Sequence, residues 1–134
     1  MASILRVNTL TDASSNNSVP IATVASGSAK AIGTIDTDTD NSIDFSFNIA
    51  SYTDRATGSL YGNFTNNMGS ATGYTVLGSP SPVEPSTMGT SNSNRTIICS
   101  ADTAARFSSN GFSDSDNTMR DLNAHSNAVY GDLA

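Results

Sequence analysis

The sequence predicts an all-β fold, an antiparallel β-sandwich or jelly-roll-like domain, and three observations support this prediction. Runs of alternating apolar and polar residues begin roughly every ten residues, which is the strand spacing of a sandwich or barrel. Serine, threonine and asparagine make up 52 of the 134 residues, a composition that suits strands with polar outer faces. Helix formers are scarce, since the chain has no Gln, a single Glu and six Leu. A chain of this length is expected to form one domain.

The first 28 residues are expected to form an extended N-terminal arm, and residues 29–134 the β-sandwich. Residues 3–10 predict a strand whose two faces are both mixed, as in a strand that lies between chains. Residues 19–25 predict a second short strand, which Pro20 confines to a sheet edge or a strand start. A polar junction with a glycine follows at 25–28, and it suggests that the arm docks on something other than its own domain, such as a neighbouring subunit.

The remaining strands follow in order along the sandwich domain. They are expected at 29–35, 42–48, 48–53, 59–65, 73–78, 95–100, 104–108 and 127–133. The three runs between Phe47 and Gly78 are separated by turn residues and predict a β-meander. Residues 79–94 hold three of the four prolines and predict a long exposed loop. Residues 113–123 have no alternation and allow a single helical turn.

Charge and targeting signals exclude several classes of function. The net charge is −6 and the arginines are scattered singly, which argues against nucleic-acid binding. The chain has neither a signal-peptide pattern nor an apolar run of membrane-spanning length, so we expect a soluble protein without membrane insertion. Cys99 is the only cysteine, so no intrachain disulfide is expected, and its apolar surroundings predict a small buried side chain in a strand.

Asp36, Asp38 and Asp40 form the sharpest metal signal, because alternating carboxylates can gather oxygen ligands around Ca²⁺. An EF-hand is excluded, since Asn41 stands where that loop needs glycine and Phe47 where it needs the bidentate glutamate. A looser Ca²⁺ site stays open as an alternative. The simpler interpretation is an exposed acidic hairpin, so no metal or other cofactor is assigned.

No complete catalytic constellation is present, and we expect no enzymatic activity. His125 is the only histidine, which weakens any Ser/His/Asp site. Three copies of it could meet on a trimer axis and bind a metal, but an exposed polar histidine is the simpler expectation. Asp114 and Asp116 form a second carboxylate pair, more typical of a solvated turn than of a metal site.

Four tyrosines could stack on sugars if they were exposed, but alternating aromatic residues in strands more often fill a core. These residues are Tyr52, Tyr61, Tyr74 and Tyr130.

Three segments together resemble a known family. An N-[IV]-x-S-x-T-D strand leads through a glycine turn to an aromatic-x-N-F-T strand, an N-x-M turn and a Y-x-V strand between Phe47 and Gly78. Ser3–Asp12 is similar to the start S-x-L-x-V-[DN]-T-[IL], and Ala128–Ala134 to the end A-V-[FY]-G-D-L-A. This order resembles virion surface proteins of tailed bacteriophages, the tail-fibre-type and related proteins of marine phages and cyanophages. The family usually has Trp after a Lys-Ala pair, whereas Lys30 and Ala31 are followed by Ile32, and residues 79–95 have no counterpart.

The resemblance implies a non-enzymatic, homotrimeric structural protein on the virion surface, made in the bacterial host cytoplasm. Residues 1–28 would bind another virion protein, and the loops of a fibre-type protein would meet a host glycan or receptor. A capsid decoration or cement protein is the alternative within this class, and a Ca²⁺-dependent carbohydrate-binding module is the alternative from another class. Low apolar content, 37% of residues, independently favours assembly, because a sparse core gains stability from burying surface against copies of itself.

Overall fold

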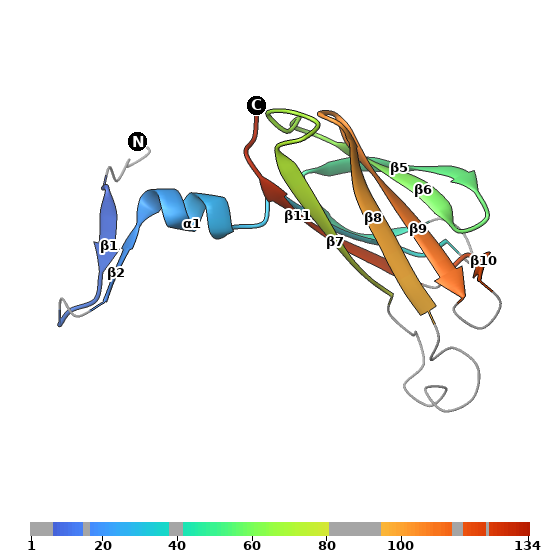
Figure 1. Ribbon diagram of the computed structural model, residues 1–134, viewed down its shortest axis with the longest axis horizontal. Coiled ribbons are helices and arrows are strands. Elements are labelled where there is room, and N and C mark those ends of the chain that lie inside the picture. Colours follow the sequence, from blue (N-terminus) through green and yellow to red (C-terminus); the bar gives the residue numbers. More distant parts are fainter. Residues whose placement is uncertain (1–6, 15–16, 38–41, 81–94, 114–116, 123) are drawn as a thin grey trace.

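The protein is a sandwich of two antiparallel β-sheets, which confirms the predicted fold class (Figure 1). The computed structural model describes residues 7–14, 17–37, 42–80, 95–113, 117–122 and 124–134. Sheet I contains, in spatial order, β4 (Ile43–Phe47), β3 (Ala31–Ile35), β11 (His125–Gly131) and β7 (Tyr74–Pro80). In sheet II, β8 (Arg95–Thr103) pairs with one edge of β9 (Arg106–Ser113), and β6 (Ser59–Phe64) followed by β5 (Ile49–Ala56) lies on the other edge. β10 (Thr118–Met119) pairs with the end of β9 on the same edge as β6. Each of the eight strands predicted after residue 29 has a counterpart in these sheets.

The predicted β-meander is wrong, because its third strand lies in the other sheet. β5 and β6 form a hairpin, but the free edge of β6 pairs with β9, and β7 crosses over to pair with β11 in sheet I. Tyr74 and Val76 do share the buried face of β7, as their alternation predicts. Alternation reveals which side of a strand faces the core, but it carries no information about the strand that pairs with it.

The core lies between the two sheets and is built around aromatic rings. The largest cluster of buried apolar residues comprises Ala31, Ile49, Phe64, Met68, Tyr74, Val76, Phe107 and Val129. Phe64 packs edge-on against Tyr74, with ring centroids 5.6 Å apart, and lies at the same distance from Phe107. Side chains from both sheets therefore contribute to one continuous core.

Asn48 forms the corner at which the chain leaves sheet I and enters sheet II. Its φ of 55° lies in the left-handed region, which asparagine tolerates better than most residues. Its side-chain amide donates hydrogen bonds to the carbonyl oxygens of Lys30 (2.9 Å) and Asn66 (3.2 Å). Its side-chain oxygen accepts one from the backbone N–H of Asn66 (2.7 Å). One side chain thus joins the start of β3 to the turn after β6.

Replacing Asn48 by alanine is expected to lower the free energy of unfolding by about 2–3 kcal/mol, because hydrogen bonds are lost and alanine is strained at positive φ. Asn48→Gly is the matched control, since it loses the same hydrogen bonds without the strain and is expected to cost about 1 kcal/mol less. Urea unfolding of both variants measures the difference. Equal losses would show that backbone strain has no part in the effect.

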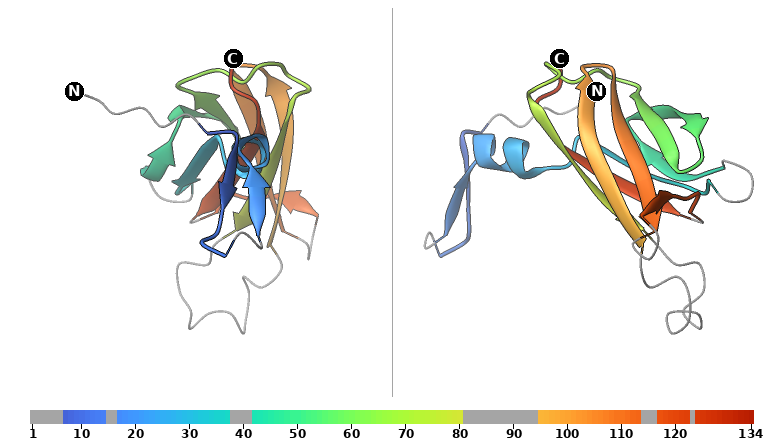
Figure 2. Two further views of the ribbon diagram at one scale, coloured as in Figure 1. Left: turned by 90° about the vertical axis from the view of Figure 1, so that its left-hand side faces the viewer. Right: turned by 45° about the vertical axis from the view of Figure 1, so that its right-hand side comes forward.

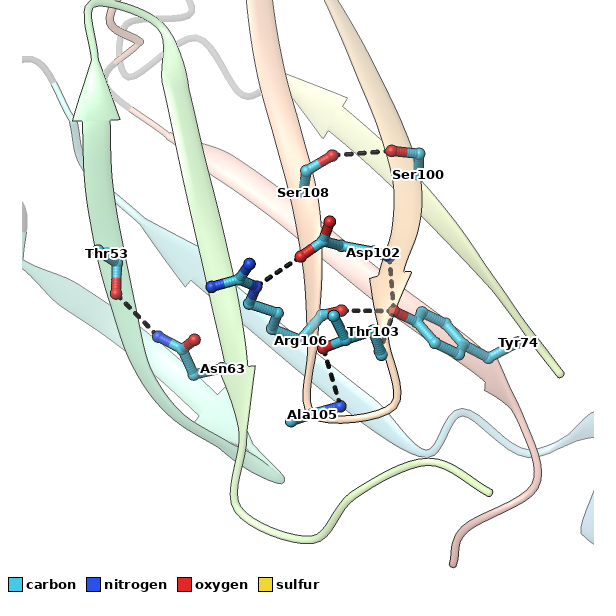
Figure 3. Close-up of polar contacts among 9 residues, drawn as sticks. All are labelled: Thr53, Asn63, Tyr74, Ser100, Asp102, Thr103, Ala105, Arg106 and Ser108. Atoms are coloured by element: carbon cyan, nitrogen blue, oxygen red, sulfur yellow. Dashed lines mark hydrogen bonds and ion pairs between the residues drawn. The ribbon is translucent and has the colours of Figure 1, made fainter. Parts of the chain in front are cut away.

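The hydroxyl of Tyr74 ties sheet I to the β8–β9 hairpin of sheet II (Figure 3). It accepts a hydrogen bond from the backbone N–H of Asp102 (3.0 Å) and lies within donating distance of the carbonyl oxygens of Thr103 (2.8 Å) and Arg106 (2.5 Å). Arg106 in turn forms an ion pair with Asp102 across the same hairpin (2.5 Å). The buried ring of Tyr74 therefore ends in a polar contact that fixes this turn.

Residues 7–28, named here the N-terminal segment, form a hairpin and a helix outside the sandwich (Figures 1 and 2). β1 (Thr9–Thr11) pairs with β2 (Ser18–Pro20), and α1 (Ile21–Gly27) follows at once. The predicted strand over 19–25 is therefore wrong after Pro20. Pairing extends one residue beyond Pro20, since the Ile21 N–H donates to the carbonyl oxygen of Asn8 (2.9 Å). The φ of −60° at Pro20 suits a helix start, and Ile21, Val24 and Ala25 then follow helical spacing.

β10 occupies part of the region in which a helical turn was predicted, and the Asp121 carboxylate beside it accepts a hydrogen bond from the backbone N–H of Gly58 (2.6 Å). The predicted loop over 79–94 lies almost wholly outside the described residues. Among the residues that are described, no helix has the length and apolar character needed to cross a membrane.

Candidate assembly interface

An uncovered row of apolar side chains crosses the outer face of sheet I. Phe47 pairs with Ile32, Ile32 with Ala128 and Ala128 with Leu77, so the four residues form one line across all four strands. Directly paired residues of antiparallel strands share a face of the sheet. Phe47, Ile32 and Leu77 are 54%, 38% and 57% exposed, although they are large and apolar. These four residues are named here the apolar row.

The paired positions beside the apolar row carry no charge, and Lys30, two residues before Ile32, directs its ammonium group to the carbonyl oxygen of Ala25. Phe45, which is 55% exposed, pairs with Thr34, and Thr34 pairs with Ser126. The hydroxyls of Thr34 and Ser126 lie 3.1 Å apart and hydrogen-bond to each other. On the other side of the row, Tyr130 pairs with Thr75. The outer face of sheet I therefore has an apolar centre flanked by neutral polar groups and aromatic rings, which is the composition of a protein contact surface.

The N-terminal segment presents a second uncovered apolar surface. Leu10 and Val19 are directly paired on one face of the β1–β2 hairpin and help to line a shallow hollow of about 380 Å³. Leu10 is 45% and Val24 is 39% exposed, and no residue of α1 is buried. The segment therefore leaves its apolar side chains in contact with water.

The outer face of sheet II is mainly polar by contrast, with Ile98 as an exposed apolar residue. Tyr61 lies between two guanidinium groups, with Arg55 Cζ 4.5 Å and Arg106 Cζ 4.0 Å from the centre of its ring. Figure 3 shows neighbouring polar pairs on the same sheet, in which Asn63 donates to Thr53 (2.9 Å) and the hydroxyls of Ser100 and Ser108 are 2.8 Å apart. The polar groups of this face bond to one another and to water. The outer face of sheet II therefore differs from the outer face of sheet I, which has an uncovered apolar centre.

The four tyrosines that could stack on sugars lie in the core, beside arginines or beside the apolar row. Tyr74 is buried, and the ring of Tyr52 packs edge-on against Phe107 at 6.3 Å. Guanidinium groups lie over Tyr61, and Tyr130 is half-buried beside the apolar row. Two of the four thus belong to the core, and the described residues do not present a group of exposed tyrosine rings.

The candidate Ca²⁺ ligands are described only in part. Asp36 follows β3, is half-buried, and donates its backbone N–H to the carbonyl oxygen of Ser42 (3.0 Å). Asp38 and Asp40 lie outside the described residues, as do Asp114 and Asp116. Within the described ranges, no group of three or more His, Cys, Asp or Glu side chains could hold a metal ion. A Ca²⁺ site at Asp36, Asp38 and Asp40 stays a prediction.

His125 is fully buried, so the prediction of an exposed histidine is wrong. It lies between the sheets with three other polar side chains, those of Ser109, Asn127 and Cys99. Its Nδ1 is 3.4 Å from the Ser109 hydroxyl, which also accepts a hydrogen bond from the Asn127 amide (3.2 Å). The Cys99 sulfur lies 3.4 Å from both Ser109 Oγ and Asn127 Nδ2. Among the residues that the structure describes, neither His125 Nε2 nor Asn127 Oδ1 finds a hydrogen-bond partner.

This buried polar cluster contains the residue types of a nucleophilic site but not the environment of one. Burial lowers the pKa of His125 to about 4, with the nearby Asp121 carboxylate opposing the shift, and burial raises the pKa of the Cys99 thiol. A neutral thiol is a weak nucleophile, and His125, Ser109 and Asn127 have almost no contact with solvent through which a substrate could reach them. The cluster therefore belongs to the interior structure.

Sequence reasoning missed this cluster because its members come from three strands. The alternation from His125 to Val129 was the available signal, since it places His125, Asn127 and Val129 on one face of β11. Val129 predicts that this face is the buried one. The apolar row was missed for a similar reason, since its four residues lie in four different strands and meet only through the strand order of sheet I.

Comparison of the chain with protein-family models, curated proteins and solved structures finds no match.

Proposed function

We propose that this chain is a non-enzymatic structural protein of a tailed-phage virion, a homotrimeric fibre-type surface protein that takes part in attachment to the host. The resemblance of three segments to virion surface proteins supplies the biological class. The observation that carries the proposal is the apolar row, an uncovered apolar line across all four strands of a sheet. Contiguous exposed apolar surface on a small protein is typical of a contact site for another protein.

The N-terminal segment gives separate support for assembly. Its hairpin and helix bury almost nothing, and a two-stranded hairpin or a seven-residue helix has little stability alone in water. Docking on another subunit or on another virion protein would supply the stability that these short elements lack.

Light scattering of the purified chain at micromolar concentration tests the oligomeric state. The expected result is a mass three times the 13.8 kDa of one chain. A folded protein that stays monomeric over this concentration range would contradict the proposed homotrimer.

A capsid decoration role would use the same two surfaces, and location separates it from the fibre-type role. Gold-labelled antibodies against the chain, applied to intact phage particles and viewed by electron microscopy, are expected to mark the tail. Labelling over the head would favour decoration, and particles without label would contradict a virion surface protein of either kind. Particles of an unrelated phage serve as the control.

A further inference from the structure

One chain carries two uncovered apolar surfaces of different shape, the apolar row and the N-terminal segment. We infer that the N-terminal segment of one copy packs across the apolar row of a second copy, so that each subunit gives one surface to each of two neighbours. The inference rests on the proposed homotrimer and adds which surfaces meet.

The N-terminal segment does not bury its apolar side chains within its own subunit. Every residue of β1 is exposed, α1 has no buried residue, and Figures 1 and 2 show the segment extending away from the sandwich. Leu10 and Val19 share one face of the hairpin, and Ile21 and Val24 are three residues apart on α1. Covering these side chains would give the segment the stability that its short elements lack.

The area of the two surfaces suits a stable contact. A fully buried aromatic side chain covers roughly 150–250 Å², so the half-exposed Phe45 and Phe47 with Leu77 and Ile32 offer on the order of 400 Å². The apolar side chains of the segment are smaller and partly covered, and they offer on the order of 250 Å². Since apolar atoms make up a little over half of a typical interface, the total buried area would be on the order of 1,100 Å², near the lower end of the range of specific complexes.

The charge of the two surfaces is also compatible with contact. No charged residue stands in the apolar row or in the paired rows beside it. Asp12 is the one charged residue between 7 and 28; it lines the hollow together with Leu10 and Val19, and its carboxylate accepts a hydrogen bond from the Asn17 amide (2.8 Å). Burying the segment on the row would therefore strip water from one carboxylate, that of Asp12, which already has a hydrogen-bond partner in Asn17.

The symmetry of the proposed contact favours a closed ring. A contact between two different surfaces is heterologous and closes into a ring when the rotation between subunits allows it, and a ring of three is a trimer. Packing of two apolar rows on each other would instead be isologous and would produce a dimer. Contact between segment and row therefore fits a homotrimer better than contact between two rows does.

Single charge substitutions on each surface test the inference. Phe47→Asp alters the row, Leu10→Asp alters the segment, and Ile98→Asp is the matched control, because Ile98 is also 54% exposed but lies in sheet II. Sedimentation velocity is expected to show monomers for the first two variants at concentrations where the wild-type chain and the control are trimers. All three positions are exposed, and circular dichroism on heating checks that each variant still folds.

Mixing the two monomeric variants provides the decisive measurement. The Leu10→Asp chain keeps an intact row and the Phe47→Asp chain an intact segment, so an equimolar mixture is expected to form a heterodimer of one chain of each kind. A mixture that stays monomeric would overturn the inference, as would a Leu10→Asp chain that remains trimeric. A wild-type chain that is itself monomeric would overturn the proposed homotrimer as well, whereas trimeric variants would overturn the segment-on-row contact alone.

Discussion

Replacing Phe107 by alanine is expected to lower the free energy of unfolding by about 3–5 kcal/mol, the largest effect of any single truncation in this core. Phe107 is completely buried and contacts the rings of Phe64 and Tyr52. Removal of its ring would leave a cavity between two sheets whose strands cannot collapse into it without losing their pairing. Urea unfolding followed by far-ultraviolet circular dichroism measures the loss, and a cost below about 1 kcal/mol would contradict the described packing.

Gly62 provides a second measurement on the same packing. It pairs directly with Phe107 across β6 and β9, and a Cβ atom at this position would collide with the Phe107 ring. Gly62→Ala is expected to cost about 1–3 kcal/mol through overpacking. Gly69→Ala is the matched control, because its nearest contact would be an ordinary 3.5 Å from the carbonyl oxygen of Asp132.

The double variant with Gly62→Ala and Phe107→Leu is expected to lose less stability than the sum of its two single variants, because the smaller side chain makes room for the new methyl group. Strict additivity would mean that the two positions do not share space. Equal midpoints for Gly62→Ala and Gly69→Ala would contradict the close approach of the ring to the β6 backbone.

Acidification is expected to destabilise the protein between pH 6.5 and pH 4 through His125. Burial lowers the pKa of this side chain from 6.5 to about 4 in the folded state, so the unfolded chain takes up the proton first as the pH falls. The stability contributed by neutral His125 is fully present above pH 6.5 and is lost progressively down to about pH 4. The shift corresponds to about 3 kcal/mol, because one pKa unit is worth about 1.4 kcal/mol.

His125→Gln separates this effect from other acid-sensitive groups. Glutamine is neutral throughout, is similar in size to histidine, and can keep a hydrogen bond to Ser109. Urea unfolding at pH 7, 6, 5 and 4 is expected to show a steeper loss for the wild-type chain than for this variant. The raised pKa of the Cys99 thiol keeps that group neutral over the same range. Parallel curves for the two proteins would exclude His125 as the acid-sensitive residue.

The sequence predicted the strands well because each of them has one buried face. Leu60 and Phe64, or Tyr74 and Val76, alternate with exposed neighbours, and this period of two is a local signal that survives without any knowledge of the fold. Strand pairing is not local, so the meander was misplaced and the apolar row was not seen. Phe47 and Leu77 become neighbours of one surface only because β3 and β11 lie between β4 and β7.

The two clearest errors have physical reasons of their own. Residues 21–27 contain Ile, Thr and Val, which favour strands in general, but the φ of −60° at Pro20 suits a helix start and the apolar spacing that follows suits a helical turn. His125 was expected at the surface because histidine is polar. Its position in the alternation of β11 decides its burial instead, and the hydroxyl of Ser109 supplies one of the hydrogen bonds that it needs there.

The position of β11 in the middle of sheet I has a consequence for the order of folding. β11 follows the other described strands in the sequence, yet it lies between β3 and β7, and its Ser126 bonds to Thr34, 92 residues earlier. While the chain is being synthesised, β3 and β7 have no partner between them until β11 leaves the ribosome. Closing such a long loop is slow, so the nascent chain carries two open strand edges that can pair with other chains. Assembly of copies is therefore safest after synthesis of β11, when sheet I is complete.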